Sequence, residues 1–314
     1  MKSGTYTDTD AGQRSARQGK EKMDSGKLIL VATPIGNLED MSSRAVSALR
    51  EADLIAAEDT RNTIKLLNHF GIRKPMTSYH EFNKIDKAYE LSGIIKSGKT
   101  VALVTDAGMP AISDPGEDMV RIAYETGIEV TVIPGPCALV SALSISGLPT
   151  RRFSFEAFLP SDKKERGDIL EEMKEETRTV ILYEAPHRLL KTLKELEGAL
   201  GGSRRISLVR ELTKVHEEVV RTTLSEAVKG YSSPEGEKKI RGEYVIVIEG
   251  RSISSAEKEM RSAWETLTIP EHVSYYESRG IDKKEAMRLA AKDRGISRRD
   301  IYQAVLEQET GNKM

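Results

Sequence analysis

One segment of the sequence combines residues that suit the binding of a ligand. The chain runs from apolar Val104 into a loop that ends at Gly116 and contains two Asp, two Gly and two Pro. Gly and Pro give such a loop a defined shape and leave backbone donors and acceptors exposed. The carboxylates of Asp106 and Asp114 suit a cation or a ribose. Few Lys or Arg lie nearby, so the pattern disfavours a polyphosphate.

Two further loops of similar composition, Thr33–Asn37 and Pro134–Cys137, also follow predicted strands. In a parallel sheet the carboxyl ends of the strands lie at one edge, where ligands bind. Any one of the three loops could be a tight turn in which a side chain caps the backbone. Three loops that converge favour a binding site.

The elements that would position these loops alternate along the chain. Apolar runs predict strands at 28–32, 54–57, 76–79, 101–105 and 130–133. Amphipathic segments predict helices at 43–51, 62–70, 84–97, 116–126 and 138–145. Near-continuous apolar strands between helices predict an α/β domain, with a parallel sheet covered on both faces.

A second α/β pattern follows Pro149, where we place a domain boundary. Strands are predicted at 153–157, 180–183, 206–209 and 244–249, and helices at 165–176, 186–199 and 223–230. No helix signal occurs in 207–222, which favours paired antiparallel strands. The predicted organisation is a disordered tail (1–26), an N-terminal α/β domain (27–148), a C-terminal α/β domain (149–250) and, after a polar linker, a helical extension (257–314). The basic residues of this extension could contact RNA or form a solvated face.

Composition excludes several classes of protein. The chain has 314 residues, a net charge of -1 and a single cysteine, Cys137. An intrachain disulfide is therefore impossible, and a cytoplasmic setting is expected. The five histidines are scattered without metal-ligand spacing, so we expect no metal site. No apolar run approaches the roughly 20 residues that span a bilayer, so we expect no membrane contact.

Gly93–Thr100 matches the Walker A pattern of nucleoside triphosphatases letter for letter. That loop works only between a strand and a following helix, because the helix N-terminus must point at phosphate. Here the order is reversed, with a predicted helix before it and a strand after it. Gly98 is better interpreted as a helix C-cap, and the phosphate loop is rejected.

Several strings in the sequence resemble the tetrapyrrole-methylase type (class III) of S-adenosylmethionine methyltransferases. Asp106–Pro110 stands where that superfamily has its Gly-Asp-Pro loop, and Pro134–Pro136 where it has Pro-Gly-x-x-Ser. Within the superfamily the chain is most similar to the ribosomal RNA small subunit methyltransferase I family. The strings that carry this resemblance lie at 33–40, 57–61, 79–83, 113–116, 183–188 and 210–214.

The resemblance implies two α/β domains with a cleft for S-adenosylmethionine between them. It also implies a cytoplasmic homodimer that methylates the ribose 2′-oxygen of a decoding-centre cytidine in the 16S rRNA of the small ribosomal subunit. The implied cofactor-binding residues are Pro34, Asp106, Ala107, Gly108, Ile112, Ser113, Asp114, Pro136, Tyr183 and Tyr244. The implied RNA-binding residues are Arg61, Arg188, Arg210 and Lys214.

Methyl transfer to a ribose hydroxyl requires alignment of the reacting atoms and help from a base. Glu58 and Asp59 follow a predicted strand, and either carboxylate could accept the proton. Asp59 could instead cap the following helix. His80 is a further catalytic candidate, because an imidazole has a suitable pKa range. Phe82 stands where the family usually has a second histidine, so that histidine has no counterpart here.

Two other classes of function stay open. One is a class III methylase that acts on a small molecule such as a porphyrin-like ring, and the other is a non-catalytic RNA-binding protein. The basic helical extension and the string Ala57–Arg61 favour the rRNA enzyme over the small-molecule methylase.

Overall fold

The computed structural model describes residues 26–252, 264 and 267–311. Apart from Gly26 and Ser252, the predicted disordered tail and the predicted polar linker lie outside these residues, as do parts of the predicted helical extension. The chain divides into two compact units between Cys137 and Ala138. The cleft expected between the two domains stays a prediction.

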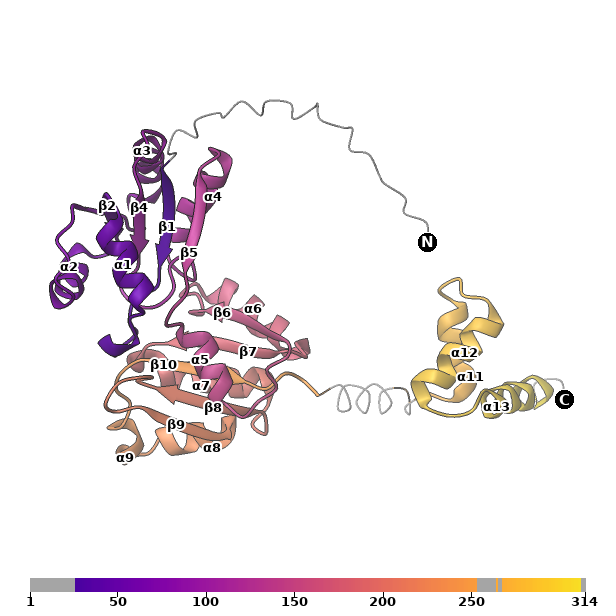
Figure 1. Ribbon diagram of the computed structural model, residues 1–314. Coiled ribbons are helices and arrows are strands. Elements are labelled where there is room, and N and C mark those ends of the chain that lie inside the picture. Colours follow the sequence, from indigo (N-terminus) through magenta and orange to yellow (C-terminus); the bar gives the residue numbers. More distant parts are fainter. Residues whose placement is uncertain (1–25, 253–263, 265–266, 312–314) are drawn as a thin grey trace, which may run out of the picture. The chain divides into compact units, whose positions relative to one another are not determined.

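The first unit is built on a five-stranded parallel sheet with the strand order β3-β2-β4-β1-β5 (Figure 1). The strands are β1 (Lys27–Val31), β2 (Leu54–Ala57), β3 (Met76–Ser78), β4 (Val101–Val104) and β5 (Glu129–Ile133). Ala57 is in register with Val104, and Val31 with Ile133. Because all five strands run the same way, their carboxyl ends lie along one edge.

Helices cover both faces of this sheet, as the sequence predicts. They are α1 (Ser43–Glu51), α2 (Thr60–His69), α3 (Lys84–Lys96) and α4 (Gly116–Glu125), and a short 3-10 helix, η1 (Leu38–Asp40), precedes α1. Ile29 and Val31 of β1 pack in the cluster of α1 and α2, whereas Leu28 and Leu30 pack in that of α3 and α4. The strands β2 and β4 are apolar throughout because both of their faces are buried.

The segment that resembles a Walker A motif ends a helix and does not begin one. α3 ends at Lys96, Ser97 donates its backbone N–H to Gly93 O, and Gly98 has a φ of +96°. A left-handed residue at this place is the usual way to terminate a helix. Strand β4 follows, so the rejection of the phosphate loop is confirmed.

The second unit contains a mixed sheet with the order β6-β7-β10-β8-β9. Its strands are β6 (Phe153–Ala157), β7 (Thr179–Glu184), β8 (Arg205–Arg210), β9 (Glu218–Thr223) and β10 (Tyr244–Ile248). Its helices are α5 (Ala138–Ile145), α6 (Lys163–Glu175), α7 (Pro186–Leu200), α8 (Leu224–Tyr231) and α9 (Pro234–Glu237). β8 and β9 pair antiparallel, which confirms the prediction for 207–222.

The division between the units differs from the sequence-based boundary near Pro149. The observed division precedes α5, a helix that we expected in the first domain. α5 packs on β7 and β10 of the second sheet and therefore belongs to the second unit. Arg221 of β9 also donates to the carbonyl oxygens of Ile145 and Ser146 and so satisfies the end of this helix.

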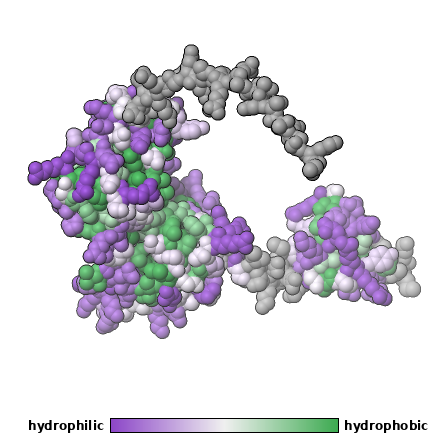
Figure 2. All heavy atoms as spheres, viewed as in Figure 1, coloured by the Kyte–Doolittle hydropathy of each residue, from purple (hydrophilic) through white to green (hydrophobic). Residues whose placement is uncertain are grey.

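The described part of the C-terminal extension forms three helices, α11 (Ile269–Glu277), α12 (Lys283–Arg294) and α13 (Arg298–Gly311). Their small core includes Ala286, Ala290, Ile301 and Val305. Tyr302, next to Ile301, is 55% exposed and lies outside this core. Hydrophilic residues dominate the visible face of these helices (Figure 2). Within the described residues, no helix has the length and apolarity to cross a membrane.

Candidate active site

The three Gly- and Pro-rich loops of the first unit meet at the carboxyl edge of its sheet. Thr33 and Gly108 exchange two backbone hydrogen bonds, with N···O distances of 2.9 and 3.0 Å. The Thr33 hydroxyl donates to Thr105 O at 3.1 Å. A Cβ on Gly135 would lie 2.8 Å from the Cβ of Ala32, so the third loop also packs closely on the first. The expected convergence of the loops is confirmed.

The loop after β4 holds strained backbone. Ala111 and Ser113 both have a φ of +66°, in the left-handed region that non-glycine residues seldom adopt. Asp114 Oδ1 accepts hydrogen bonds from Ala111 N at 3.0 Å and Gly116 N at 2.8 Å, and burial raises the pKa of this carboxyl. Each strained residue costs about 1–3 kcal/mol, and such strain concentrates at functional sites. Asp114, which we predicted to bind the cofactor, thus accepts hydrogen bonds from the backbone of its own loop.

A network of carboxylates joins the ends of β2 and β4. Glu58 Oε2 accepts from the Thr105 hydroxyl at 2.7 Å and from Asp106 N at 3.4 Å. Asp106 Oδ1 accepts from Asp59 N at 3.2 Å, and its Oδ2 accepts from Asn62 Nδ2 at 3.3 Å. Asp106 lies 47 residues after Asp59 in the sequence, yet it joins the adjacent Glu58 and Asp59 in one hydrogen-bonded cluster.

Asp59 has a structural task in this cluster. It is the N-cap of α2, where Oδ1 accepts from Arg61 N at 2.8 Å. The Arg61 guanidinium also donates to both Asp59 oxygens, at 3.0 and 2.7 Å. These hydrogen bonds from Arg61 lower the pKa of Asp59 to about 2. A carboxylate held so firmly in its ionised form is a weak base, so the capping alternative describes Asp59 better than the catalytic one.

A pocket of about 270 Å³ opens beside this cluster. Its lining residues are Thr33, Pro34, Gly36, Leu38, Asn62, Thr63, Lys65, Leu66, Thr105 and Asp106. Only Lys65 and Asp106 of this lining carry titratable side chains. Burial raises the pKa of the Asp106 carboxyl, and the charges of Glu58 and Asp59 act in the same direction. Sequence reasoning missed Asn62 and Lys65, although their spacing of three along α2 places both on one helix face.

His80 lies outside the pocket lining. It follows β3, where its backbone N–H donates to Asn83 Oδ1 at 2.8 Å. Its Nδ1 is buried without a hydrogen-bond partner. Phe82, two residues further, is 97% exposed. The structure therefore does not bring the predicted catalytic His80 to the cavity where Asp106 lies.

The two tyrosines predicted to bind the cofactor have different surroundings. The Tyr183 hydroxyl accepts a hydrogen bond from Leu139 N at 3.1 Å, in the first turn of α5. Its ring contacts Phe155 and Phe158 edge-on, with centroids 4.9 and 5.7 Å away. Tyr244 is 2% exposed and packs in the core of the second unit. The side chain of Tyr244 therefore stabilises the core, and its role in cofactor binding stays a prediction.

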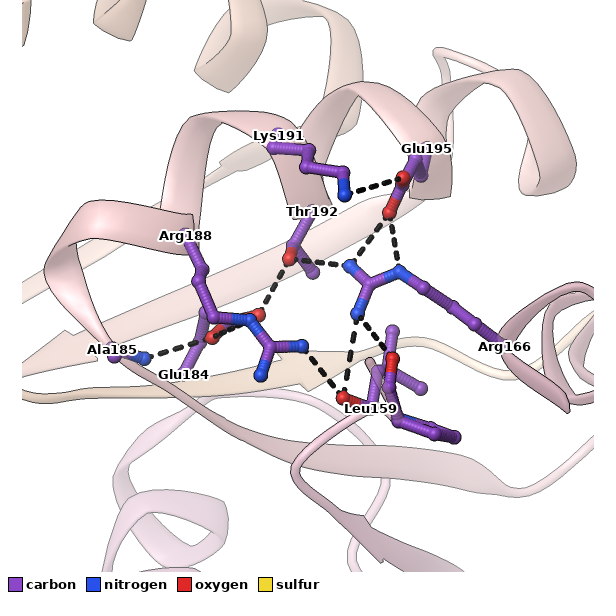
Figure 3. Close-up of polar contacts among 9 residues, drawn as sticks. Leu159, Arg166, Glu184, Ala185, Arg188, Lys191, Thr192 and Glu195 are labelled. Atoms are coloured by element: carbon purple, nitrogen blue, oxygen red, sulfur yellow. Dashed lines mark hydrogen bonds and ion pairs between the residues drawn. The ribbon is translucent and has the colours of Figure 1, made fainter. Parts of the chain in front are cut away.

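Three of the four predicted RNA-binding cations are compensated inside the second unit. Arg188 donates to Leu159 O at 2.6 Å and lies 3.4 Å from Glu184 Oε1 (Figure 3). Arg210 pairs with Glu218 at 3.1 Å. Lys214 pairs with Glu211 at 2.9 Å and with Glu243 at 2.8 Å. RNA binding by these three residues stays a prediction. The Arg61 side chain, by contrast, is 86% exposed.

Comparison with known proteins defines the class of this fold. Residues 27–228 match the family model for tetrapyrrole (corrin/porphyrin) methylases. A structure of diphthine synthase superposes with a TM-score of 0.56 at 15% identity, covering 71% of this chain and 90% of the other. A uroporphyrin-III C-methyltransferase from Thermus thermophilus gives a TM-score of 0.51 at 18% identity, covering 71% and 94%. The paired sheets and the loops at the sheet edge are thus those of a tetrapyrrole methylase.

Curated relatives narrow this class. The ribosomal RNA small subunit methyltransferase I of Halalkalibacterium halodurans is 49% identical over 90% of this chain and 96% of its own length. The protein of the same name from Bacillus subtilis is 46% identical over 90% and 95%. The chain therefore belongs to the ribosomal RNA small subunit methyltransferase I family of the tetrapyrrole methylases. It is a methyltransferase, and its methyl donor is S-adenosylmethionine.

The loops at the sheet edge fit this donor. Gly108 has a φ of +89°, and a side chain there would lie 3.3 Å from Ile35 Cγ2. Gly108 and Gly135 have no side chains, so the backbone groups of these loops remain open to a ligand. The near absence of cations among these loops suits a donor without phosphates.

Proposed function

We propose that the chain methylates the ribose 2′-oxygen of a decoding-centre cytidine in 16S rRNA. The observation that carries this proposal is the similarity to relatives named for the ribosomal small subunit, at 49% identity over 90% of the chain. The string Ala57–Arg61, on which the resemblance partly rests, forms the end of β2 and the start of α2 beside the pocket. A substrate-binding role for that string explains why the resemblance extends over it.

The methyl donor is held, in this proposal, by the backbone of the three converging loops. The residues assigned to it are Pro34, Ala107, Gly108, Ile112, Ser113 and Pro136. The strained left-handed residues after β4 support this assignment, because strain of this kind persists where a binding surface needs it. A role for Tyr183 is indirect, through its hydrogen bond to α5, which directly follows the third loop.

The RNA backbone is bound by cations at the start of α2. Arg61 extends into solvent, and Lys65 lines the pocket. Both can contact phosphates while a nucleoside enters the cavity, and phosphate contacts position an RNA without reading its sequence. The predicted homodimer and the cytoplasmic location stay predictions.

The test is methyl transfer from labelled S-adenosylmethionine to 30S particles that lack the modification. We expect label in one cytidine of the decoding centre, at a ribose that then resists alkaline cleavage. Binding to the particles without transfer would favour the non-catalytic RNA-binding protein. Label in a porphyrin-like acceptor and none in rRNA would favour the small-molecule methylase, and either result would overturn the proposal.

A further inference from the structure

The proposed reaction needs a group that takes the proton of the ribose hydroxyl. Such a base must lie in the cavity that admits the nucleoside and must have a free position for the proton. The pocket beside α2 contains one carboxylate, Asp106, and one ammonium group, Lys65. An ammonium group can only donate while it is charged.

The other candidate bases at this edge of the sheet do not line the pocket. Glu58 faces the Thr105 hydroxyl and Asp106 N and is not part of the pocket lining. Asp59 is the N-cap of α2 and forms an ion pair with Arg61. His80 lies beyond the pocket, in the loop after β3.

We infer that Asp106 is the catalytic base of the methyl transfer, an assignment that rests on the proposed function. Its two oxygens each accept one hydrogen bond, from Asp59 N and Asn62 Nδ2, at the long distances of 3.2 and 3.3 Å. A carboxylate oxygen has two lone pairs, so each oxygen retains capacity to accept another proton. The two donors fix the orientation of the carboxylate and leave it accessible from the pocket.

The step balances without a further reactant. The ribose 2′-oxygen forms a bond to the methyl carbon while the sulfur–methyl bond breaks and its electron pair stays on sulfur. The hydroxyl proton passes to Asp106, which becomes neutral, and the positive sulfonium becomes a neutral thioether. The carboxylic acid then returns its proton to solvent.

The charges around Asp106 suit this role. Glu58 and Asp59 approach it from the end of β2, and Arg61 and Lys65 lie on α2. The two nearby carboxylates favour proton uptake by Asp106, because a proton removes one of three like charges. This explains why the cluster contains three acids when only one of them lines the cavity.

The test compares Asp106→Asn, which keeps the shape but cannot take a proton, with Asp106→Glu, which keeps the carboxylate. In single-turnover methyl transfer to 30S particles we expect Asp106→Asn to lose about 10²–10⁴-fold in rate, the usual contribution of a general base. Its dissociation constant for S-adenosylmethionine should stay within about threefold of wild type, a change below about 0.7 kcal/mol. Asp106→Glu should recover part of the rate.

The matched control is Asp53→Asn, the same substitution at the opposite end of the same two strands. Asp53 Oδ2 accepts from Thr100 N at 2.8 Å before β4, a bond that an amide oxygen can also accept. This variant should transfer methyl at the wild-type rate.

Three results overturn the inference, and they can be told apart. A rate for Asp106→Asn within about threefold of wild type would exclude a base at this position. A loss of rate matched by an equal loss of donor affinity would make Asp106 a cofactor ligand, as the sequence resemblance implied. Absence of labelled rRNA with the wild-type chain would overturn the proposed function and the assignment of Asp106 with it.

Discussion

Thr192 of α7 joins two buried charges in the second unit. Its hydroxyl accepts from Arg166 Nη2 at 2.8 Å and donates to Glu184 Oε2 at 2.5 Å (Figure 3). The exposed fractions of Thr192, Glu184 and Arg166 are 0, 2 and 5%. Valine has nearly the shape of threonine without the hydroxyl, so Thr192→Val leaves a guanidinium N–H and a carboxylate oxygen without that partner.

The expected cost follows from these two bonds. A hydrogen bond to a charged group contributes about 1.5–3 kcal/mol, so losing two sets an upper limit of about 6 kcal/mol. Both charges keep other partners. Arg166 still donates to Glu195 at 2.6 Å, and Glu184 still accepts from Ala185 N at 2.9 Å. We therefore expect Thr192→Val to lower the local free energy of unfolding by about 3 kcal/mol.

Native-state hydrogen exchange measures this effect, since it resolves peptides of β7 and α7 separately from those of the first unit. The control is Thr192→Ser, which keeps the hydroxyl and loses one buried methyl group, at a cost of about 1 kcal/mol. Peptides of β1 should exchange as in wild type in both variants. If Thr192→Val and Thr192→Ser lowered the free energy of unfolding equally, the hydroxyl would contribute little to stability. The reasoning from the buried network would then be wrong.

Three further predictions concern the first unit. Gly135→Ala places a Cβ 2.8 Å from the Cβ of Ala32, and should weaken S-adenosylmethionine binding by about tenfold or more in calorimetry; unchanged affinity would remove this loop from the donor site. The pKa of Asp59, lowered to about 2 by Arg61, should appear as a carboxyl NMR titration near that pH and rise toward 3.8 in Arg61→Gln. Because the folded pKa lies below the ordinary one, this stabilisation is complete above about pH 4 and is lost as the pH falls toward 2; a midpoint of 3.8 in wild type would contradict the ion pair. Tyr79→Phe removes a buried hydroxyl that donates at 2.9 Å to the carbonyl preceding α4, and should cost about 1 kcal/mol in urea unfolding, with no change expected if that bond were absent.

Much of the fold could be predicted because its signals are local. The bounds of α1, β2 and α5 agree with the sequence-based ranges, since apolar periodicity and cap residues act within a few positions. The parallel order of the first sheet then implies that its loops share one edge. The convergence of Thr33, Gly108 and Gly135 therefore follows from the strand pattern of the sequence.

The partner of each charged side chain could not be predicted in this way. Asp106 and Asn62 are 44 residues apart, and only the pairing of β2 with β4 brings the segments that follow these strands within hydrogen-bonding distance. Arg188 belongs to a string that carries the family resemblance and was expected to contact RNA, yet it lies against a backbone carbonyl 29 residues away. A sequence pattern records which side chains are polar, but not which polar groups meet.

The sequence by itself determined the class of this protein, its order of strands and helices along the chain, and the sheet edge at which its three Gly- and Pro-rich loops converge. The tertiary structure decided which carboxylate lines the pocket and which ones support the fold. The physical reason is that hydrophobic pattern and backbone caps are properties of neighbouring residues, whereas the burial, charge and hydrogen bonds that set the chemistry of Asp59 and Asp106 come from residues on other elements.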